Sequence, residues 1–550
     1  MKADPMFHDA RNIPADTTLT TDICIMGAGV AGISMAKEFM SAGFKTAIIE
    51  SGGLTPDKET QSLYWGENIG IPYYPLDTSR SRFFGGTSHF WHIKLPEKGM
   101  GVRLRPMDAI DFEYRDWVPY SGWPYPKSTL IPFYERAQQV CQIGPFNYDP
   151  EYWSDDQRTP LPLRDGRTGT TIFQFAEREI FFKQYKEELE RSPQVSVFLH
   201  GNVTEIETSE NAGEVTRLRV DCLQGNRFYV KARFYVMAMG AIETARLLLL
   251  SDRVCKTGLG NQNDLVGRFF MEHPHLWSGT FVPSSLAVSN STRLYQIFRK
   301  NGLPLLAKLT VSEKVLREEK LANWCTSIHP DYQLSYQHYM LRDKRGVAAF
   351  RKLKSKFSRK PESGSIANLL GDILGDPASI TLAAARKIKG GFRKEFARDR
   401  HTAVFKLNHM AEQTPNPDSR VLLADERDGL GQRRVNLDWR LNALDVRTIT
   451  RAQQIVDSSL RKAGLGYLNI ETRPDEIPET IHGGWHHMGT TRMSADPKQG
   501  VVDPDCRIHG TPNLYIAGAS VFPTAGYANP VLTTIAVTLR LADHLKQQMN

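Results

Sequence analysis

The sequence lacks any apolar stretch long enough to cross a membrane as a helix. No run of about 18 consecutive apolar residues occurs in it, which excludes a protein built from several membrane-spanning helices. Residues 1–20 include Asp4, Asp9, Arg11 and Asp16 and contain no long apolar core. We therefore expect neither a secretory nor a twin-arginine leader.

Cysteine is sparse and scattered along the chain. No two cysteines form a CxxC pair or stand at a Cys/His spacing typical of zinc ligands, so no metal site is expected. This use of cysteine favours a reducing compartment and hence a cytoplasmic protein. The cysteines are Cys24, Cys141, Cys222, Cys255, Cys325 and Cys506.

Extremes of composition are also absent. Hydrophobic residues make up 41% of the 550 residues and charged residues 24%, which is typical of a globular protein and excludes a mainly disordered or collagen-like chain. At roughly 150 residues per domain, this length predicts three or four domains, or two large ones. No internal repeat is evident.

Positive charge is concentrated in one segment. The chain has a net charge of +8, yet residues 342–398 alone hold 15 Lys or Arg against 5 Asp or Glu. Phe350, Leu353 and Phe357 recur there at helical spacing. One interpretation is a helical insertion that lies on an anionic membrane surface, as a peripheral contact. The other, which we favour, is a solvated lid or insertion, because basic helices are far commoner than membrane-binding ones.

Nucleic-acid binding is not expected. The basic segment 342–398 lacks interleaved stacking aromatics, and no known nucleic-acid module is visible in the sequence.

A glycine-rich fingerprint stands near the N-terminus. The apolar run 23–26 is followed by Gly27, Gly29 and Gly32 at GxGxxG spacing, and Glu50 stands 18 residues after Gly32. In such a motif the first glycine permits a tight turn, the second lets the backbone approach a pyrophosphate, and the third lets the helix lie close to the strand. The acidic residue binds ribose hydroxyls. The motif predicts dinucleotide binding and leaves FAD and NAD both open.

Strand, glycine turn and helix recur later, which indicates one nucleotide-binding domain built from separated pieces. We expect the FAD-binding domain to comprise 1–110, 195–285 and 480–550, and a substrate-binding cap to comprise 110–195 and 285–480, including the basic insertion. Periodicity predicts the following elements: a helix at 31–41, a strand at 46–49, a helix from about 127, strands of a small sheet within 195–207 and 217–233, a strand and helix in 235–250, strands of a second sheet within 274–283 and 421–437, a helix at 448–464, a strand at 514–517 and a helix at 530–545.

The C-terminal motifs carry a resemblance to a known family. The segments HHMGTTRM (486–493), NLYIAGASVFPT (513–524) and GYANPVLT (526–533) resemble the signature of the glucose–methanol–choline (GMC) oxidoreductases. GGTSHFW (85–91) and VGRFFMEHPH (266–275) also fit, and the segment 121–137 is similar to the pyranose-oxidase-like bacterial branch. The resemblance implies an α/β (α+β) fold, with a discontinuous Rossmann-like FAD-binding domain and a mixed-sheet cap. It also implies an enzyme that oxidises a CH–OH group with FAD.

Two catalytic residues are implied by the resemblance. The family's catalytic histidine corresponds to His486, three residues before Gly489, and His487 is its natural competitor or a supporting partner. The second polar position corresponds to Asn529, which could instead be a turn residue before Pro530. His482 is expected to be structural.

The chemistry fits these residue types. A neutral imidazole, with a pKa of about 6.5, can accept the alcohol proton near neutral pH, while an amide can hold the alcohol oxygen. The helix that begins at Pro530 offers N–H groups to the negative charge of reduced flavin.

The cofactor contacts that we expect come from the fingerprint, the glycine-pair loop, the two later glycine turns and the last helix. They are Gly27, Gly29, Gly32, Glu50, Ser51, Arg82, Gly85, Gly86, Thr87, Ser88, Trp91, Val203, Ala238, Gly240, Gly518, Ala519, Asn529, Pro530 and Val531. Some relatives attach FAD covalently through a histidine in the glycine-pair loop. Here Phe90 takes that position, so we expect dissociable FAD, although His89 and His92 flank it.

The expected substrate is a sugar, a glycoside or a related alcohol, and an aliphatic or sterol-like alcohol stays open. Trp117, Trp123, Trp153 and Trp324 could be platforms for sugar faces or part of a core. The electron acceptor could be oxygen, a quinone or a redox protein. Two alternatives are a flavoprotein subunit of an electron-transfer complex and an NAD-dependent enzyme built on the same glycine motif.

Overall fold

The computed structural model describes residues 6–95, 98–335, 403–473 and 476–549. The basic segment 342–398 lies outside these residues, so the lid and membrane-contact hypotheses for it stay predictions. In the part of the chain that is described, no helix is both long and apolar enough to cross a bilayer.

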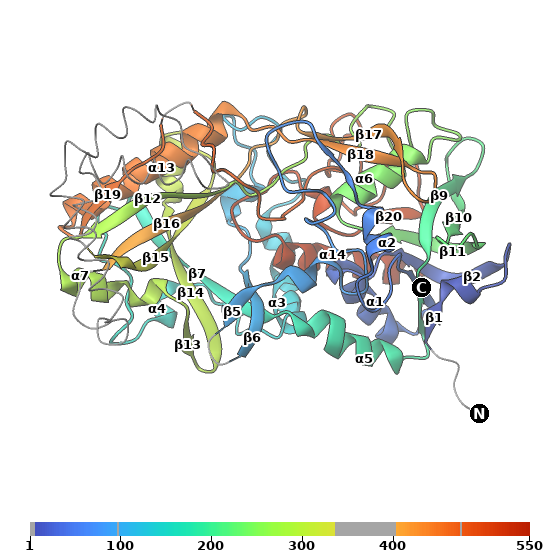
Figure 1. Ribbon diagram of the computed structural model, residues 1–550, viewed down its shortest axis with the longest axis horizontal. Helices are drawn as coiled ribbons and strands as arrows, with labels where there is room; N and C mark the ends of the chain where they lie inside the picture. Colours follow the sequence, from blue (N-terminus) through green and yellow to red (C-terminus); the bar gives the residue numbers. More distant parts are fainter. Residues whose placement is uncertain (1–5, 96–97, 336–402, 474–475, 550) are drawn as a thin grey trace, which may run out of the picture.

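An eight-stranded sheet forms the end of the molecule that carries the glycine fingerprint, on the right in Figure 1. Its order is β1-β8-β3-β2-β11-β10-β9, and β20 pairs with the last residues of β11. Strands β1, β8, β3, β2, β11 and β20 are parallel to their neighbours in this order. Strands β10 and β9 extend the sheet beyond β11 in antiparallel pairs. The strands are β1 (Phe7–Asp9), β2 (Thr18–Met26), β3 (Thr46–Ile49), β8 (Val195–Leu199), β9 (Asn202–Thr208), β10 (Val215–Asp221), β11 (Arg227–Met237) and β20 (Leu514–Ile516).

The sequence explains why these strands lie in the centre. The last four residues of β2 and all of β3 are buried, as expected for apolar parallel strands that are covered on both faces. The separate small sheet that we predicted from 195–207 and 217–233 is wrong. Those strands extend the large sheet instead, because β8 pairs with β3 and β11 pairs with β2.

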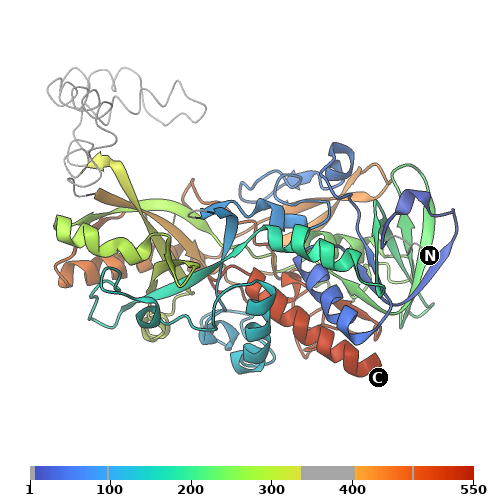
Figure 2. The ribbon, with the colours of Figure 1, turned by 90° about the horizontal axis from the view of Figure 1, so that it is seen from below.

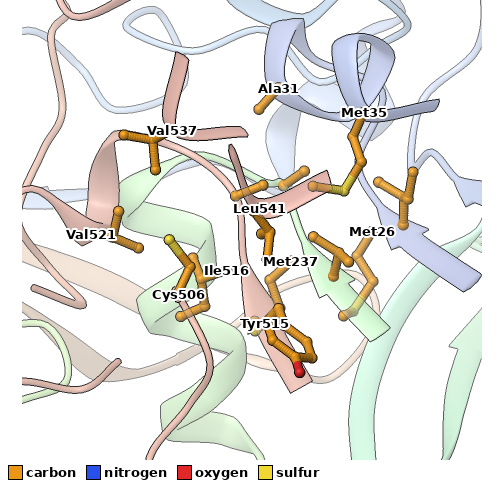
Figure 3. Packing of buried hydrophobic residues seen from close by; sticks show 14 of the residues in the cluster. Met26, Ala31, Met35, Met237, Cys506, Tyr515, Ile516, Val521, Val537 and Leu541 are labelled. Carbon is orange, nitrogen blue, oxygen red and sulfur yellow. The ribbon is translucent and has the colours of Figure 1, made fainter. Parts of the chain in front are cut away.

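Helices cover the eight-stranded sheet. α14 (Val531–Met549) packs against both α1 (Val30–Ala42) and α3 (Ile131–Val140), and α6 (Ala241–Leu250) packs against β9. Figure 2 shows α14 running beside α1. Figure 3 shows the apolar contacts between these helices and the ends of the strands. The buried residues labelled there are Met26, Ala31, Met35, Met237, Cys506, Tyr515, Ile516, Val521, Val537 and Leu541.

A nine-stranded sheet forms the other end, with order β19-β12-β16-β15-β14-β7-β6-β5 and with β13 paired to β14. All its described pairs are antiparallel, so the mixed sheet expected for the cap is wrong in this detail. Its strands are β5 (Ile93–Leu95), β6 (Lys98–Leu104), β7 (Thr168–Glu177), β12 (His275–Pro283), β13 (Phe298–Lys300), β14 (Leu303–Val311), β15 (Trp324–Ser335), β16 (Ala403–Ala411) and β19 (Gly466–Asn469).

One long helix, α13 (Ala443–Lys462), packs on this sheet. Its buried residues, such as Ile449 and Ile455, join an apolar cluster with Leu276 and Leu407 of the strands. The helix begins five residues before the predicted 448 because Asn442 and Asp445 form a capping box.

A small sheet lies beside α6. It contains β17 (Arg420–Arg427), β18 (Arg433–Asp438) and β4 (Gly66–Asn68), with β17 and β18 antiparallel and β18 and β4 parallel. The strand predicted within 274–283 therefore lies in the second large sheet as expected, but those predicted within 421–437 do not. The remaining helices are α2 (Lys58–Ser62), α4 (Pro150–Trp153), α5 (Tyr185–Glu190), α7 (Leu286–Ser291) and α8 (Glu313–Glu318), the π-helical turn η5 (Ile180–Gln184) and the 3-10 turns η1 (Ala10–Asn12), η2 (Gly86–Phe90), η3 (Ala109–Phe112), η4 (Lys127–Leu130), η6 (Thr292–Tyr295) and η7 (Ala519–Val521).

The strands bear on the proposed division into two domains. β5, β6 and β12 fall within the pieces 1–110 and 195–285, which we assigned to the cofactor domain, yet they belong to the nine-stranded sheet. The division stays a proposal, and the strands favour boundaries near 92 and 274.

Candidate active site

Residues from both large sheets line one cavity of about 560 Å³. The segments that follow β2, β3, β11 and β20 all open into it. These are the carboxyl ends of parallel strands, which is where open α/β sheets bind their ligands. Its opposite wall comes from the nine-stranded sheet.

Most of the predicted site residues line this cavity. Among them are both predicted catalytic residues, His486 and Asn529. The cofactor positions that line it are Gly27, Gly29, Glu50, Ser51, Arg82, Gly86, Thr87, Trp91, Val203, Ala238, Gly240, Gly518, Ala519, Asn529, Pro530 and Val531.

The remaining three predicted residues, Gly32, Gly85 and Ser88, do not line it. A Cβ on Gly32 would lie 2.0 Å from the carbonyl oxygen of Gly27, so this glycine is needed for close packing of α1 on the loop. The Gly85 N–H donates to the Ala28 carbonyl at 2.8 Å, and the Ser88 hydroxyl donates to the Gly85 carbonyl at 2.7 Å. These two residues hold the glycine-pair loop against the fingerprint loop.

The glycine loops leave open space for a ligand. A Cβ on Gly29, Gly240 or Gly518 would meet no protein atom within 4 Å, although all three residues line the cavity. Gly27, Gly240 and Gly518 also have φ values of 102°, 76° and 140°, a region that side chains disfavour.

Glu50 is fixed at the end of β3. One carboxylate oxygen accepts from the Ala28 N–H at 2.8 Å and the other accepts from the Gly52 N–H at 2.9 Å. The side chain is buried and still lines the cavity. Its place beside the fingerprint loop suits the predicted role towards ribose hydroxyls.

An ionic network fixes Arg82. Its guanidinium lies 3.0 Å from the Glu243 carboxylate on α6, and Glu243 also pairs with Arg80 at 3.1 Å and Arg246 at 3.0 Å. Burial opposes the charge on Glu243, but the three arginines prevail and lower its pKa to about 2. Arg80, Arg82 and Arg246, which together form an arginine wall, therefore share one ionised carboxylate.

His486 stands in a chain of hydrogen bonds that defines its tautomer. The His273 Nε2 lies 3.3 Å from the Ala525 carbonyl, which can only accept, so His273 Nε2 carries the proton. His273 Nδ1 is then an acceptor, and the His486 Nδ1 at 2.9 Å donates to it. His486 Nε2 is left with a lone pair, towards which the Asn529 Nδ2 donates at 3.0 Å.

Several influences keep His486 neutral. Removal from water lowers its pKa well below the usual range, and the neighbouring His273, His275, Arg103 and His487 act in the same direction. A neutral imidazole that lines a ligand cavity can act as a general base when a ligand hydroxyl replaces the Asn529 amide at its lone pair. Asn529 Oδ1 is buried and has no partner within the protein, so it is available to a ligand.

Glu272 holds the backbone of the histidine loop. Its carboxylate accepts from the backbone N–H groups of His273, Gly484 and His486, each at 3.0 Å, and from the Tyr73 hydroxyl. Burial nevertheless raises the pKa of Glu272 to about 7. The Tyr73 oxygen lies 2.8 Å from His487 Nε2, which favours a supporting role for His487.

The register of the nine-stranded sheet explains its cavity wall. Trp277 pairs with Asn408, and Asn408 with Ser327, so these residues share one face with His275 and His329, two positions along their strands. Arg103 pairs with Phe175 on β7, whose alternate residue Thr171 pairs with Lys308. The opposite face holds the apolar residues that pack on α13.

Sequence reasoning missed most of this wall. Arg103, His275, Trp277, His329 and Asn408 line the cavity, but they come from four different strands, β6, β12, β15 and β16. Only His275, together with Glu272 and His273, lay in a segment (266–275) that the resemblance highlighted. The predicted sugar platforms are core residues instead: Trp123, Trp153 and Trp324 are buried, and Trp117 packs against the apolar cluster.

The histidines near the glycine-pair loop differ in position. His89 is stacked between Phe83 and Phe182, with ring centroids 4.3 and 3.9 Å away, and does not line the cavity. Phe90 and His92 do line it.

Comparisons with known proteins agree with this architecture. Residues 415–538 match the family model described as GMC oxidoreductase. The 2-methyl-1,2-propanediol dehydrogenase of Mycolicibacterium austroafricanum is 22% identical over 96% of this chain and 96% of its own length. The 6'''-hydroxyparomomycin C oxidase of Streptomyces lividus is 25% identical over 97% of this chain and 93% of its own length. The solved structure of formate oxidase superposes with a TM-score of 0.53 at 15% identity, over 97% of this chain and 99% of that one, which shows a common fold.

The fold, the cavity and these matches define a FAD-dependent oxidoreductase of the class that oxidises alcohols and sugars. The C-terminal part of the chain, residues 415–538, matches the GMC oxidoreductase family model, as the C-terminal motifs predicted. These comparisons favour FAD over NAD, which the glycine motif left open.

The residues present fit that cofactor. The open glycine positions 29, 240 and 518 give room for a backbone approach, and Ser81 Oγ and Arg82 Nε are buried cavity-wall atoms without a protein partner. We infer that the fingerprint loop, Glu50 and the arginine wall hold the nucleotide part, and that the histidine loop and the start of α14 hold the ring system.

Proposed function

We propose that the protein oxidises a CH–OH group of a sugar, a glycoside or a related alcohol to the carbonyl, with His486 as the base. The observation that carries the proposal is the His486–Asn529 pair, in which an imidazole lone pair and an amide face the same cavity. The pyranose-oxidase-like branch is part of this proposal.

The chain's own residues move the proton and hold the alcohol. When the alcohol binds, its hydroxyl replaces the Asn529 Nδ2 at the lone pair of His486 Nε2, and the hydroxyl proton passes to that nitrogen. The freed Asn529 N–H donates to the alcohol oxygen, and the C–H bond breaks as the C=O bond forms. Bound FAD supplies the acceptor for the hydride. Proton and hydride together account for the two hydrogens that the alcohol loses.

The start of α14 favours negative charge in the cavity. Pro530 and Val531 line it at the helix N-terminus, where unpaired N–H groups give a partial positive charge. His486 keeps its hydrogen bond to His273 when Nε2 becomes protonated, because His486 Nδ1 carries a proton in both states.

Two aspects support a sugar-like alcohol. Trp277, whose ring centroid lies 5.0 Å from that of His329, and Trp485 line the cavity together with polar groups such as Asn408. Aromatic and polar side chains in one cavity suit the faces and hydroxyls of a sugar. Two relatives that match nearly the whole chain are named for 2-methyl-1,2-propanediol and for 6'''-hydroxyparomomycin C.

The test is anaerobic reduction of the bound flavin by a panel of sugars, glycosides and simple alcohols. We expect His486→Ala to slow bleaching of the flavin band by roughly 10²–10⁴-fold and Asn529→Ala to slow it by about 10–100-fold, with FAD still bound. His482→Ala is the matched control, since His482 lines the same cavity but its ring hydrogen-bonds the Thr480 carbonyl of its own loop. Unchanged rates in the first two variants would remove them from the mechanism. Bound flavin that no alcohol bleaches would favour the electron-transfer subunit.

We propose further that FAD is dissociable. Phe90 offers no nucleophile, and the His89 ring packs between the rings of Phe83 and Phe182. Acid precipitation should leave the flavin in the supernatant; flavin that stays with the pellet in the wild type but not in His92→Ala would show attachment at His92. A cytoplasmic location, an acceptor among oxygen, a quinone and a redox protein, and membrane contact through 342–398 are proposals that rest on the sequence.

A further inference from the structure

The cavity-facing side of the nine-stranded sheet carries positive charge without matching negative charge. Cross-strand register places Arg103, Lys308 and His329 on this face. The acidic residues on the same face of these strands, Glu177 and Asp331, lie near strand ends and have interactions of their own. Arg103 and Lys308 are therefore the groups in the middle of the face that can carry positive charge near neutral pH, since burial lowers the pKa of His329 to about 4.

Arg103 is the permanently charged member of this face that lines the cavity. It lines the cavity together with His486 and Asn529, and it is close enough to lower the pKa of His486, His275 and His329. Its Nε is buried and has no hydrogen-bond partner, and among the described residues no carboxylate forms an ion pair with it.

Its neighbours behave differently. Arg105, two residues along the chain, pairs with Asp108 at 2.7 Å. Lys308 is fully buried, contacts Cys325 Sγ at 3.7 Å and does not line the cavity, and burial lowers its pKa to about 7. Arg103 alone combines a permanent charge, access to the cavity and the lack of a protein anion.

Burying a guanidinium costs free energy unless an anion or strong hydrogen-bond acceptors pair with its N–H groups. On the proposed function, the substrate enters this space. We propose that the substrate alcohol carries a carboxylate, which pairs with Arg103 while its hydroxyl lies at His486 and Asn529. A planar carboxylate matches the fork of a single guanidinium, whereas a doubly charged phosphate would need a second cation on the wall.

The test compares matched neutral and anionic alcohols on the FAD-loaded protein. D-Glucuronate and D-glucose are titrated anaerobically while flavin reduction is followed. We expect Arg103→Met to raise the apparent Kd for glucuronate at least 30-fold and that for glucose less than threefold, with Arg103→Lys in between. Lys94→Met is the control, because Lys94 is an exposed charge on the adjacent strand β5.

A second measurement needs no turnover. Acetate should perturb the spectrum of the oxidised flavin saturably in the wild type but not in Arg103→Met. The neutral acetamide should perturb the spectrum of neither protein. Equal losses for glucose and glucuronate in Arg103→Met, or tighter binding of inorganic phosphate than of acetate, would overturn the proposal. Failure of every alcohol to reduce the flavin, with the acetate effect intact, would instead refute the alcohol oxidation and leave the anion site standing.

Discussion

At the scale of single residues, a carboxylate remote in sequence holds the base in place. Glu272 precedes the histidine loop by more than two hundred residues, yet it accepts the backbone N–H groups of Gly484 and His486. These donors fix the loop, and the His273 ring beside Glu272 fixes the orientation of the His486 imidazole. Small errors in such positioning are costly to catalysis.

We predict that Glu272→Gln slows flavin reduction at saturating alcohol by about 10–100-fold with little change in substrate Kd, because an amide cannot accept all these N–H groups. Stopped-flow reduction measures both constants. Asp445→Asn is the control: Asp445 is also a buried carboxylate that accepts backbone N–H groups, but it lies outside the cavity wall. Loss of stability in both variants with slow reduction in neither would leave Glu272 a merely structural residue.

Some residues of the candidate active site could be predicted from the sequence, and others could not. His486 and Asn529 were predictable because each stands in a compact local motif. Tyr73 and Arg103 depend on partners hundreds of positions away or on cross-strand register, so nothing in their immediate sequence marks them. Glu272 lay in the segment 266–275 that the resemblance highlighted, but its role depends on the distant histidine loop.

At the scale of elements, α1 and β3 were predicted to within one residue at each end, whereas β2 begins five residues before the predicted run 23–26. Buried strands β2 and β3 read as apolar runs, and the glycines mark the turn between β2 and α1. Which sheet each strand joins was harder to predict, because β8, β11 and β20 reach the same sheet from distant parts of the chain. A strand's pairing partner is a tertiary choice that its own periodicity does not encode.

Two neighbouring glycines separate packing from cofactor binding. We predict that Gly29→Ala leaves the thermal stability of the FAD-free protein nearly unchanged but weakens FAD binding at least tenfold, since its Cβ would project into open cavity space. Gly32→Ala should destabilise the FAD-free protein by roughly 1–3 kcal/mol or more, since its Cβ would clash with the Gly27 carbonyl. Differential scanning calorimetry and flavin titration measure the two effects. Equal destabilisation by both variants would contradict the assignment.

At the scale of the whole molecule, buried ionisable groups set the response to pH. Burial lowers the pKa of His273 and His329 to about 4 and that of His409 and His487 to about 3. Such groups stabilise the folded state above their unfolded pKa of about 6.5, and this contribution is lost as the pH falls. Buried Glu272 and Asp445, raised to about 7, act in the opposite sense and lose their contribution as the pH rises through 7. Stability should therefore be greatest near pH 6–7.

His409 allows this balance to be tested away from the active site. Its ring is fully buried on β16, lies 3.0 Å from the Ser278 carbonyl and does not line the cavity. We predict that His409→Gln, which keeps a donor for that carbonyl, flattens the fall of stability between pH 6.5 and 4.5 by about 1.4 kcal/mol per pH unit, because one fewer proton is bound on unfolding. Urea titrations across this pH range would show the variant less stable than the wild type at pH 7 and approaching or passing it at pH 5, with flavin reduction unchanged. Parallel stability curves would show that His409 does not contribute to acid unfolding.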